Sequence, residues 1–423
     1  MVANGGRMSC RSVLVGLALL GLSLTGCGRS VPPLLDPAIA IHGADKADWA
    51  SLPRLPVKQG VVFRGQARVS AFNIHNYLAH DGAQFEIMWT SNPVNEGEAG
   101  SRVMRAVSAD GLTWSQPSFI TPLPPAGQRY FARGFWRRGD QTLALVSQDR
   151  AGGYFGADLR MLAFEQQGPA DQLWTSLGVM APDVITNFSP SPLLDGAWLE
   201  SGRDSAKRIS FLKGGVAGWD RWTKYPVPQP SLRWDWRIWP ATAPERRPPG
   251  ERWRSWVRIP VPVLVRPSLD EPIWWTLPDG RLMALFRDNI GRRLYQSIGA
   301  ADGQSWTRPE RTNFPDATSK IAGQRLTNGL YVLVSNARPQ LEERNPLVLS
   351  VSRDGLTFTA MGILLDAPTR RRVLGERKTP GYQYPQILER NGTLYVAYSR
   401  NKEDIEVVSV PIAAIEALAG SPD

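Results

Sequence analysis

The feature that most constrains this chain is a short turn pattern that occurs three times. It reads Ser-Ala-Asp-Gly-Leu-Thr-Trp at 108–114, and it returns with small changes at 301–306 and 352–358. An Asp-Gly pair between strand-forming residues marks a β-hairpin turn, because Gly accepts positive φ and Asp can hydrogen-bond its own turn backbone. The flanking Ser or Thr and the closing aromatic make the pattern more specific. Three copies therefore predict a repeated β-hairpin architecture.

Modules of apolar strands repeat around these turns from residue 61 onward. Each module has a strand, a Gly- or Asn-containing turn, a second strand, a loop and a third strand that leads to a tight turn near an aromatic residue. We count six copies, which span 75–110, 131–174, 188–222, 271–306, 319–358 and 384–408. The sixth copy stops one strand short, and Val61-Val-Phe63 is a strand of the required type.

A missing strand at one end of the chain and a spare strand at the other predict a closed ring. Such a ring closes when the N-terminal strand completes the last four-stranded sheet, which protects both edges. We therefore predict an all-β fold, a six-bladed β-propeller over residues 59–411 that is closed by its N-terminal strand. An insertion at about 223–268 is crowded with Pro, Arg and Trp, and a seventh blade hidden there is the main alternative. Residues 412–423 form a C-terminal tail with room for a helical turn or two.

The composition agrees with a turn-rich β protein that meets an acidic partner. The 423 residues include 39 Gly, 35 Pro and 16 Trp. The net charge of +10 is compatible with an acidic glycan, an anionic membrane surface or nucleic acid. Because the basic residues are dispersed and no nucleic-acid-binding motif accompanies them, we expect a glycan or acidic-sugar partner and no nucleic acid. Phosphate-binding loops, His/Cys metal clusters and Ser-His-Asp motifs are missing from the sequence, so we expect neither a cofactor nor a metal.

The N-terminus has the features of a targeting segment. Two arginines precede an apolar run at 13–24, and Leu-Thr-Gly-Cys at 24–27 matches a bacterial lipobox. We expect a lipoprotein signal peptide over 1–26, a lipid on Cys27 that anchors the protein to the membrane, and a tether with little fold of its own over 27–58. A glycine follows the cysteine where aspartate would mark inner-membrane retention, which favours the outer membrane of a bacterial cell envelope. The alternatives are an uncleaved anchor or an ordinary secreted protein.

The repeated turn resembles the Asp-box, or BNR repeat, of sialidase (neuraminidase)-like β-propellers. The resemblance covers the chain from about 61 to 410 and is closest from about 271 onward. It implies that the first strand of each blade lines a central channel, where the site residues meet. In that family an arginine triad binds the substrate carboxylate, a tyrosine paired with a glutamate is the nucleophile, and an aspartate is the acid/base. The implied activity is that of a retaining exo-glycoside hydrolase that releases a terminal acidic sugar from glycans.

Four positions match the family's site residue by residue. The segment 271–287 resembles the family's fourth blade, which makes Glu271 the carboxylate partner and Arg287 a triad arginine. The segment around Arg344 resembles the fifth blade and makes it another triad arginine. Gly-Tyr-Gln-Tyr-Pro at 381–385 resembles the nucleophile strand, so Tyr384, or failing it Tyr382, is the candidate nucleophile. These residue types suit the task, because guanidinium groups bind carboxylates through paired hydrogen bonds and a phenol needs a carboxylate to take its proton.

Two regions depart from the family pattern. Where the family has Arg-Ile-Pro in the first blade, this chain has Asn-Ile-His at 73–75. The first triad arginine is therefore absent or is supplied by Arg64 or Arg68. The loop expected to bring the aspartate acid/base holds Glu96 and Glu98 instead.

Several further residues are candidates for the channel. His75 falls at a channel position, where it could act as a general acid or base, hydrogen-bond a sugar, or simply pack against the first turn. Asn73 and Arg133 are candidate substrate contacts, and Lys320 and Asp316 are other charged residues that could face the channel.

Three functions are compatible with these residues. The first is the sialidase-like hydrolase, with Glu96 or Glu98 as the acid. The second is a polysaccharide lyase or another glycosidase centred on His75, and the third is a non-catalytic glycan-binding surface lipoprotein. Simpler roles stand beside the catalytic ones: the arginines could form ion pairs between blades, and Tyr384 could pack within a strand. Trp274 and Trp275 could stack on sugar faces, although core packing is the commoner role of tryptophan.

Overall fold

The computed structural model of the chain describes residues 34–39, 49–138, 141–152, 157–166, 174–206, 208–213, 222–224, 231–240, 256–265, 267–290 and 292–420. These residues all lie in one compact unit, Pro33–Asp423. The expected signal peptide and Cys27 lie outside the described residues, so the lipid anchor stays a prediction.

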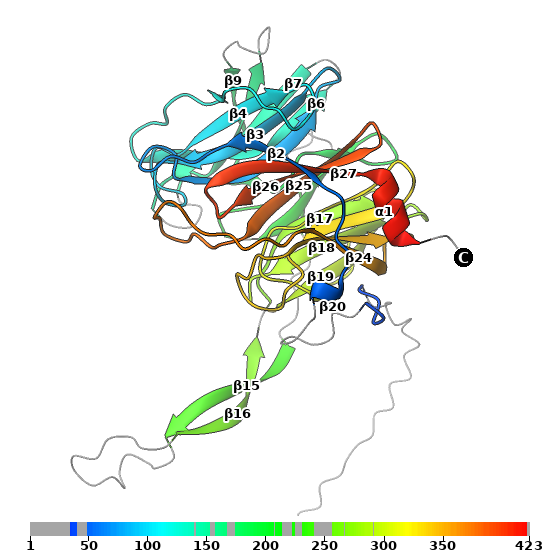
Figure 1. Ribbon diagram of the computed structural model, residues 1–423. Coiled ribbons are helices and arrows are strands. Elements are labelled where there is room, and N and C mark those ends of the chain that lie inside the picture. Colours follow the sequence, from blue (N-terminus) through cyan, green and yellow to red (C-terminus); the bar gives the residue numbers. More distant parts are fainter. Residues whose placement is uncertain are drawn as a thin grey trace, which may run out of the picture. The chain divides into compact units, whose positions relative to one another are not determined.

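Six small antiparallel sheets form a six-bladed β-propeller, which confirms the predicted fold class (Figure 1). Blade 1 contains β2 (Phe72–His80), β3 (Phe85–Asn92), β4 (Arg102–Ser108) and β5 (Ser118–Phe119). Blade 2 contains β6 (Gln128–Arg138), β7 (Gln141–Arg150), β8 (Arg160–Gln166) and β9 (Trp174–Pro182). Blade 3 contains β10 (Ile185–Thr186), β11 (Ser191–Pro192), β12 (Trp198–Arg203), β13 (Ile209–Lys213) and β14 (Trp222–Lys224).

The remaining three blades follow the insertion. Blade 4 contains β17 (Leu269–Thr276), β18 (Leu282–Asp288), β19 (Arg293–Gly299) and β20 (Glu310–Pro315). Blade 5 contains β21 (Ala322–Arg325), β22 (Tyr331–Ser335), β23 (Leu347–Ser352) and β24 (Phe358–Leu365). Blade 6 contains β25 (Tyr382–Arg390), β26 (Thr393–Arg400), β27 (Asp404–Pro411) and β1 (Lys58–Phe63).

The insertion forms a two-stranded hairpin and adds no seventh blade. Its strands β15 (Ser231–Pro240) and β16 (Trp256–Val265) pair antiparallel over their full length, from Ser231 with Val265 to Pro240 with Trp256. In this hairpin, each strand pairs only with the other, so the four-stranded unit of a blade is not built among the described residues of the insertion.

The second strand of a blade is apolar because it is covered on both faces. β18, Leu-Met-Ala-Leu-Phe-Arg-Asp, is buried at every position, since each blade is packed between two neighbours. One core cluster joins Leu199 and Phe211 of blade 3 with Leu282 and Phe286 of blade 4. The continuous apolar runs in the sequence are therefore a consequence of blade-on-blade packing.

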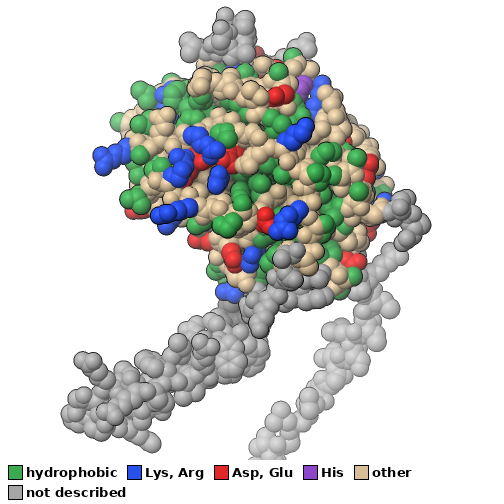
Figure 2. Space-filling model, in the orientation of Figure 1, with side chains coloured by type: hydrophobic (Ala, Val, Ile, Leu, Met, Phe, Trp, Pro, Cys, Tyr) green, Lys and Arg blue, Asp and Glu red, His purple; other side chains and the backbone are tan. Residues whose placement is uncertain are grey.

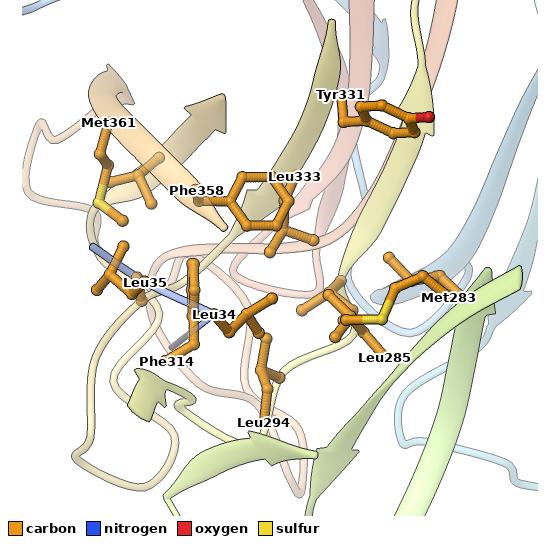
Figure 3. Packing of buried hydrophobic residues seen from close by; sticks show 14 of the residues in the cluster. Leu34, Leu35, Met283, Leu285, Leu294, Phe314, Tyr331, Leu333, Phe358 and Met361 are labelled. Atoms are coloured by element: carbon orange, nitrogen blue, oxygen red, sulfur yellow. The ribbon is translucent and has the colours of Figure 1, made fainter. Parts of the chain in front are cut away.

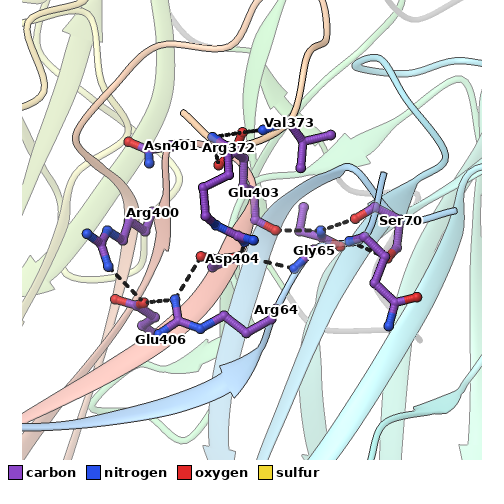
Figure 4. A network of polar contacts seen from close by, with 12 residues as sticks. Arg64, Gly65, Ser70, Arg372, Val373, Arg400, Asn401, Glu403, Asp404 and Glu406 are labelled. Atoms are coloured by element: carbon purple, nitrogen blue, oxygen red, sulfur yellow. Dashed lines mark hydrogen bonds and ion pairs between the residues drawn. The ribbon is translucent and has the colours of Figure 1, made fainter. Parts of the chain in front are cut away.

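The N-terminal strand closes the ring as predicted. β1 pairs antiparallel with β27, from Lys58 opposite Ser409 to Phe63 opposite Ile405, and the blue strand lies beside the red β27 in Figure 1. Past the end of β1, the Arg64 guanidinium donates to Asp404 at 2.7 Å and to Glu406 at 2.5 Å (Figure 4). These bonds join the two ends of the propeller sequence.

The Asp-box turns are structural. The Asp110 carboxylate accepts the backbone N–H groups of Thr113 at 2.7 Å and Leu112 at 2.9 Å. These hydrogen bonds, the one from Thr113 foremost, lower the pKa of Asp110 to about 2. Gly111 has φ 76°, and a Cβ atom there would come within 2.5 Å of the Tyr395 ring in blade 6. The first box thus holds its hairpin closely against the preceding blade.

The other two boxes touch their preceding blades in the same way. Trp306, which ends the second box, stacks on Phe211 of blade 3 with ring centroids 4.1 Å apart. In the third box, the Gly355 carbonyl accepts a hydrogen bond from the Trp275 indole of blade 4 at 3.1 Å. The aromatic and glycine positions of the motif are therefore contacts between blades.

The segment predicted to be a tether contains residues that are part of the fold. Leu34 and Leu35 are almost fully buried and pack with Phe314, Phe358 and Met361 (Figure 3). The Leu35 backbone forms a parallel bridge to Phe358, and the Leu34 carbonyl accepts the Phe358 N–H at 2.8 Å. The expectation of little fold over 27–58 is therefore wrong for these residues, because their leucines complete the core of blades 4 and 5.

The C-terminal tail forms a helix, α1 (Ile412–Ala419), whose Ile415 is buried against blades 5 and 6. Within the described ranges, no helix has the length and apolar character needed to cross a membrane. On the face drawn in Figure 2, Lys and Arg side chains gather around acidic ones, so the positive charge visible on this face does not form an isolated basic patch.

Candidate active site

Four of the inner strands carry a β-bulge at a site residue, among them β6, whose pairing register shifts between Ala132 and Gly134, at Arg133. The pairing register shifts between Ile74 and Tyr77 in β2, between Asp270 and Ile273 in β17, and between Gln383 and Gln386 in β25. Inside these bulges His75, Glu271 and Tyr384 have φ of 52°, 44° and 56°. Such left-handed conformations are costly for non-glycine residues and cluster at functional sites.

The bulges open onto one cavity at an end of the central channel. Its volume is about 580 Å³, and every blade contributes three residues to its wall. In order from blade 1 to blade 6, these are His75, Glu96, Gly97, Arg129, Phe131, Arg133, Ile185, Asn187, Arg203, Glu271, Arg287, Asn289, Thr318, Glu342, Arg344, Arg377, Tyr384 and Lys402. Six arginines and one lysine face three glutamates, so the cavity favours an anionic ligand.

Two arginines converge on one point of the wall. Arg287 donates to the Thr318 carbonyl at 3.2 Å, and Arg344 donates to the same carbonyl at 3.4 Å. Arg287 also pairs with Glu271 at 3.2 Å, and a further bond ties Arg344 to Gln383. Both guanidinium groups are therefore held in fixed positions beside each other, as binding a carboxylate requires.

Tyr384 lies against the cationic side of the cavity. The Arg344 Cζ atom is 5.8 Å and the Lys402 Nζ atom 6.0 Å from its ring centroid. Burial raises the pKa of the Tyr384 phenol, and the carboxylates of Glu96 and Glu271 raise it further. The phenol is therefore protonated at neutral pH, and it needs a base before it can attack.

His75 packs edge-on against Tyr384, with ring centroids 5.0 Å apart and the ring planes at 74°. Its Nδ1 atom is buried and has no hydrogen-bond partner among the described residues. Burial lowers the pKa of His75 well below 6.5, and the charges of Arg133 and Lys320 add to this effect. The imidazole is therefore neutral at physiological pH.

A loop between β3 and β4 brings Glu96 to the cavity. Its carboxylate pairs with the Lys402 ammonium at 3.2 Å, and Lys402 also donates to the Arg377 carbonyl at 2.8 Å. Burial lowers the pKa of Lys402 to about 8, partly opposed by the charge of Glu96. Lys402 thus links the Glu96 loop of blade 1 with the Arg377 segment that precedes blade 6, at the wall of the cavity.

Some predicted candidates lie outside the cavity wall. The Glu98 carboxylate accepts the backbone N–H groups of Val94 and Asn95 and so caps its own loop. The Asn73 amide donates to the Ser70 and Glu403 carbonyls, both at 2.7 Å, and supports the chain beneath the site.

Tyr382 and Arg64 are also structural. The Tyr382 hydroxyl donates to the Ala367 carbonyl at 2.9 Å, and its ring packs against Tyr398 in the core of blade 6. Arg64 belongs to the ring-closing network, and Arg68 is exposed. The structure therefore gathers Glu271, Arg287, Arg344, Tyr384, Glu96, His75 and Arg133 at the cavity, and leaves Glu98, Asn73 and Tyr382 outside it.

Sequence reasoning missed several wall residues. Lys402 and Arg377 come from connections around the last blade, and Arg203 ends β12, where it pairs with Asp270 at 2.9 Å. No local motif marks these positions. A proline directly after Glu271 and after Tyr384 was an available signal for two of the bulges, because proline inside a strand is confined to edges, strand starts and bulges. Across the described residues, no group of three metal-binding side chains occurs.

Comparison with known proteins supports the class of fold. Residues 249–396 match the family model of a BNR repeat-like domain. A solved structure named "Sialidase" superposes with a TM-score of 0.58 at 19% identity, covering 85% of this chain and 33% of its own. The Hadza microbial sialidase Hz136 superposes with a TM-score of 0.59 at 12% identity, and the match covers 82% of this chain and 67% of Hz136. The Trypanosoma rangeli sialidase in complex with sialic acid superposes with a TM-score of 0.53 at 11% identity, and the match covers 86% of this chain and 60% of that sialidase.

This chain thus spans about a third of the length of the first of these structures. A search of curated proteins finds no match. The blades and the matching domain together define a sialidase-like six-bladed β-propeller. Within that class, residues 249–396 match a BNR repeat-like domain, from the end of the insertion into β26 of the sixth blade, and the predicted resemblance is confirmed at this level.

Proposed function

We propose that this protein is a sialidase-like exo-glycoside hydrolase that releases a terminal acidic sugar with retention of configuration. One observation carries the proposal. Tyr384, Glu271, Arg287 and Arg344, which are scattered over more than a hundred residues of sequence, line the same cavity. A tyrosine nucleophile is a known exception to the two-carboxylate scheme of glycosidases.

The first step forms a covalent glycosyl-tyrosine. The sugar carboxylate binds to Arg287 and Arg344, which places the anomeric carbon near the Tyr384 hydroxyl. Tyr384 attacks this carbon while its proton passes to the Glu271 carboxylate. Glu96, after taking up a proton from solvent, protonates the glycosidic oxygen, and the bond from this oxygen to the anomeric carbon breaks.

The second step reverses these roles. Glu96, now ionised, takes a proton from a water molecule, and the resulting hydroxide attacks the anomeric carbon. The bond to the Tyr384 oxygen breaks, and Glu271 returns the proton to the phenolate. Two displacements at one carbon restore the original configuration.

The nucleophile is tested with Tyr384→Phe. We expect at least a thousandfold loss of kcat, on the order of the losses found on removing a nucleophile. The assay uses a panel of glycosides of acidic sugars, including sialosides, with NMR to follow the anomer first released. Tyr382→Phe removes a hydroxyl two residues away whose only described bond is to a backbone carbonyl, so it should retain activity. Equal activity of both variants would contradict the assignment.

A second candidate function rests on His75. Its buried, unpartnered Nδ1 in the cavity wall and its neutral state suit a general base in a lyase or another glycosidase. His75→Ala abolishing turnover while Tyr384→Phe is tolerated would select this function. Saturable binding of an acidic oligosaccharide with no product from any substrate would indicate a glycan-binding protein instead.

A further inference from the structure

A second cavity lies further along the central channel. Its volume is about 410 Å³, which is within the range of about 300–1,000 Å³ usual for small-molecule sites. Residues of its wall follow the first cavity's residues on the same inner strands: Leu78 follows His75 in β2, and Gln386 follows Tyr384 in β25. Because a strand advances about 3.3 Å per residue, the second cavity occupies the next level of the channel.

A buried polar group stands between the two levels. The Lys320 ammonium donates to the Asn187 carbonyl at 2.7 Å and to the Tyr77 hydroxyl at 3.2 Å. It also lies 4.1 Å from the Phe188 ring centroid. Asn187 lines the first cavity and Phe188 the second. This cluster from blades 1, 3 and 5 marks the division between the cavities, so the second is not simply an extension of the first.

The chemistry of the second wall differs from that of the first. No carboxylate occurs among the described residues that line it, and Arg325, an exposed residue, is its one charged side chain. The other polar groups are hydroxyls and carboxamides, among them Gln324 and Gln386. One cationic side chain lines the second cavity, whereas seven line the first, so the second cavity attracts an anionic ligand less strongly.

Two features of this wall suit an uncharged, hydroxylated ligand. The Gln386 Nε2 atom is buried without a hydrogen-bond partner among the described residues, and a ligand oxygen would satisfy this donor. Trp274 is half-buried and lines the cavity, whereas the adjacent Trp275 is buried with its indole N–H bonded to Gly355. A pyranose ring presents hydroxyls at its edge and apolar C–H groups on its face, which match an amide and an indole.

We propose that the second cavity binds a neutral sugar, with Trp274 against the face of the ring and Gln386 donating to a hydroxyl. The protein would then hold neutral residues of a glycan-bearing surface at one level of the channel while the first cavity takes an acidic sugar at the other. This site does not depend on the hydrolase activity.

The test is direct binding of neutral sugars to the mature chain, solubilised in a detergent without a sugar headgroup. Glucose, galactose, N-acetylglucosamine and lactose are titrated by calorimetry, with saturation-transfer NMR to show which sugar protons contact the protein. We expect saturable one-to-one binding of at least one of them. Gln386→Leu keeps the side-chain size and removes the amide, and it should weaken binding at least about tenfold.

Two further variants keep the test decisive. Trp274→Ala should also weaken the interaction about tenfold, whereas Arg287→Lys, in the first cavity, should leave it unchanged. Near-identical melting temperatures would show that the variants are folded. The proposal is overturned if none of the sugars binds, or if Arg287→Lys removes binding that Gln386→Leu leaves intact.

Discussion

Lys402 shows how a single residue can set the pH range of the site. Its ammonium lies 3.2 Å from the Glu96 carboxylate in the basic cavity. Burial lowers its pKa to about 8, so it is charged below that pH and neutral above it. An anionic ligand is therefore attracted less strongly in mildly alkaline solution.

We expect KM for an acidic sugar substrate to rise as the pH increases through about 8. Lys402→Met should raise KM about tenfold at pH 7 and remove this part of the pH dependence, whereas Lys402→Arg should retain its charge and keep KM low at pH 9. Initial rates between pH 6 and 9 measure these profiles. A wild-type profile in Lys402→Met would show that Lys402 makes no contribution to binding.

At the scale of the residue, the sequence identified single cavity residues better than the contacts that those residues make. Glu271, Arg287, Arg344 and Tyr384 stand beside recognisable neighbours, so local patterns could find them. Lys402 belongs to a turn whose importance depends on Glu96, three hundred residues earlier in the chain. Only the folded ring brings such a pair together, so no local pattern in the sequence could indicate it.

At the scale of the element, the Asp-box turns connect blades as well as closing hairpins. Gly355 has φ 73°, and a Cβ atom there would lie 3.0 Å from Trp275, Leu277 and Tyr331. The glycine is therefore required for two reasons, its left-handed backbone and the close approach of the neighbouring side chains.

Gly355→Ala should lower the free energy of unfolding more than Gly392→Ala does. Gly392 has φ 70°, and a Cβ atom added there would have no other atom within 4 Å, so its substitution costs only the backbone term of about 1–2 kcal/mol. At Gly355 the overlap should add about 1–3 kcal/mol. Chemical denaturation of both variants measures the difference. Equal losses would mean that the box does not pack tightly on blade 4.

The bulges are the elements that the sequence predicted least well. The repeated modules of apolar strands predict β2, β17 and β25, but they do not reveal the extra residues that give His75, Glu271 and Tyr384 positive φ. Prolines mark two of these bulges. In β2 the residue after His75 is Asn76, whose amide donates to the Tyr384 carbonyl at 3.0 Å, a contact between blades that no local rule predicts.

At the scale of the whole molecule, closure of the ring depends on one strand. Val62 of β1 is 7% exposed and packs in the cluster shared by blades 1 and 6, whereas its neighbour Val61 is 40% exposed. The two valines thus offer a matched pair on opposite faces of the closing strand.

Val62→Asp should destabilise the protein by about 3 kcal/mol or more, because it buries an unpaired charge. Val61→Asp should change stability by less than about 0.5 kcal/mol. Thermal unfolding and size-exclusion chromatography follow the two variants. Val62→Asp should also expose the edge of β27 and aggregate. Similar melting temperatures for both would show that closure by β1 contributes little.

The ring, its blade count and its closing strand were predictable because each module repeats a local pattern and because the sixth module lacked one strand. The packing of Leu34 and Leu35 was not, since a stretch rich in Pro and Ala resembles a linker until its leucines meet Phe358. The insertion pairs as one hairpin, and this pairing depends on contacts within the insertion itself, which its Pro, Arg and Trp content does not reveal.

The pairing of β1 with β27 also determines when the fold can be completed. Lys58–Phe63 leaves the ribosome before the other strands, and its partner Asp404–Pro411 is made more than three hundred residues later. Until then the early strand has no strand to pair with, and contacts so distant in sequence form slowly. The sixth blade, which supplies Tyr384 and Lys402, must therefore be the last to assemble, so a nascent or truncated polypeptide would lack part of the cavity wall until Asp404–Pro411 is made.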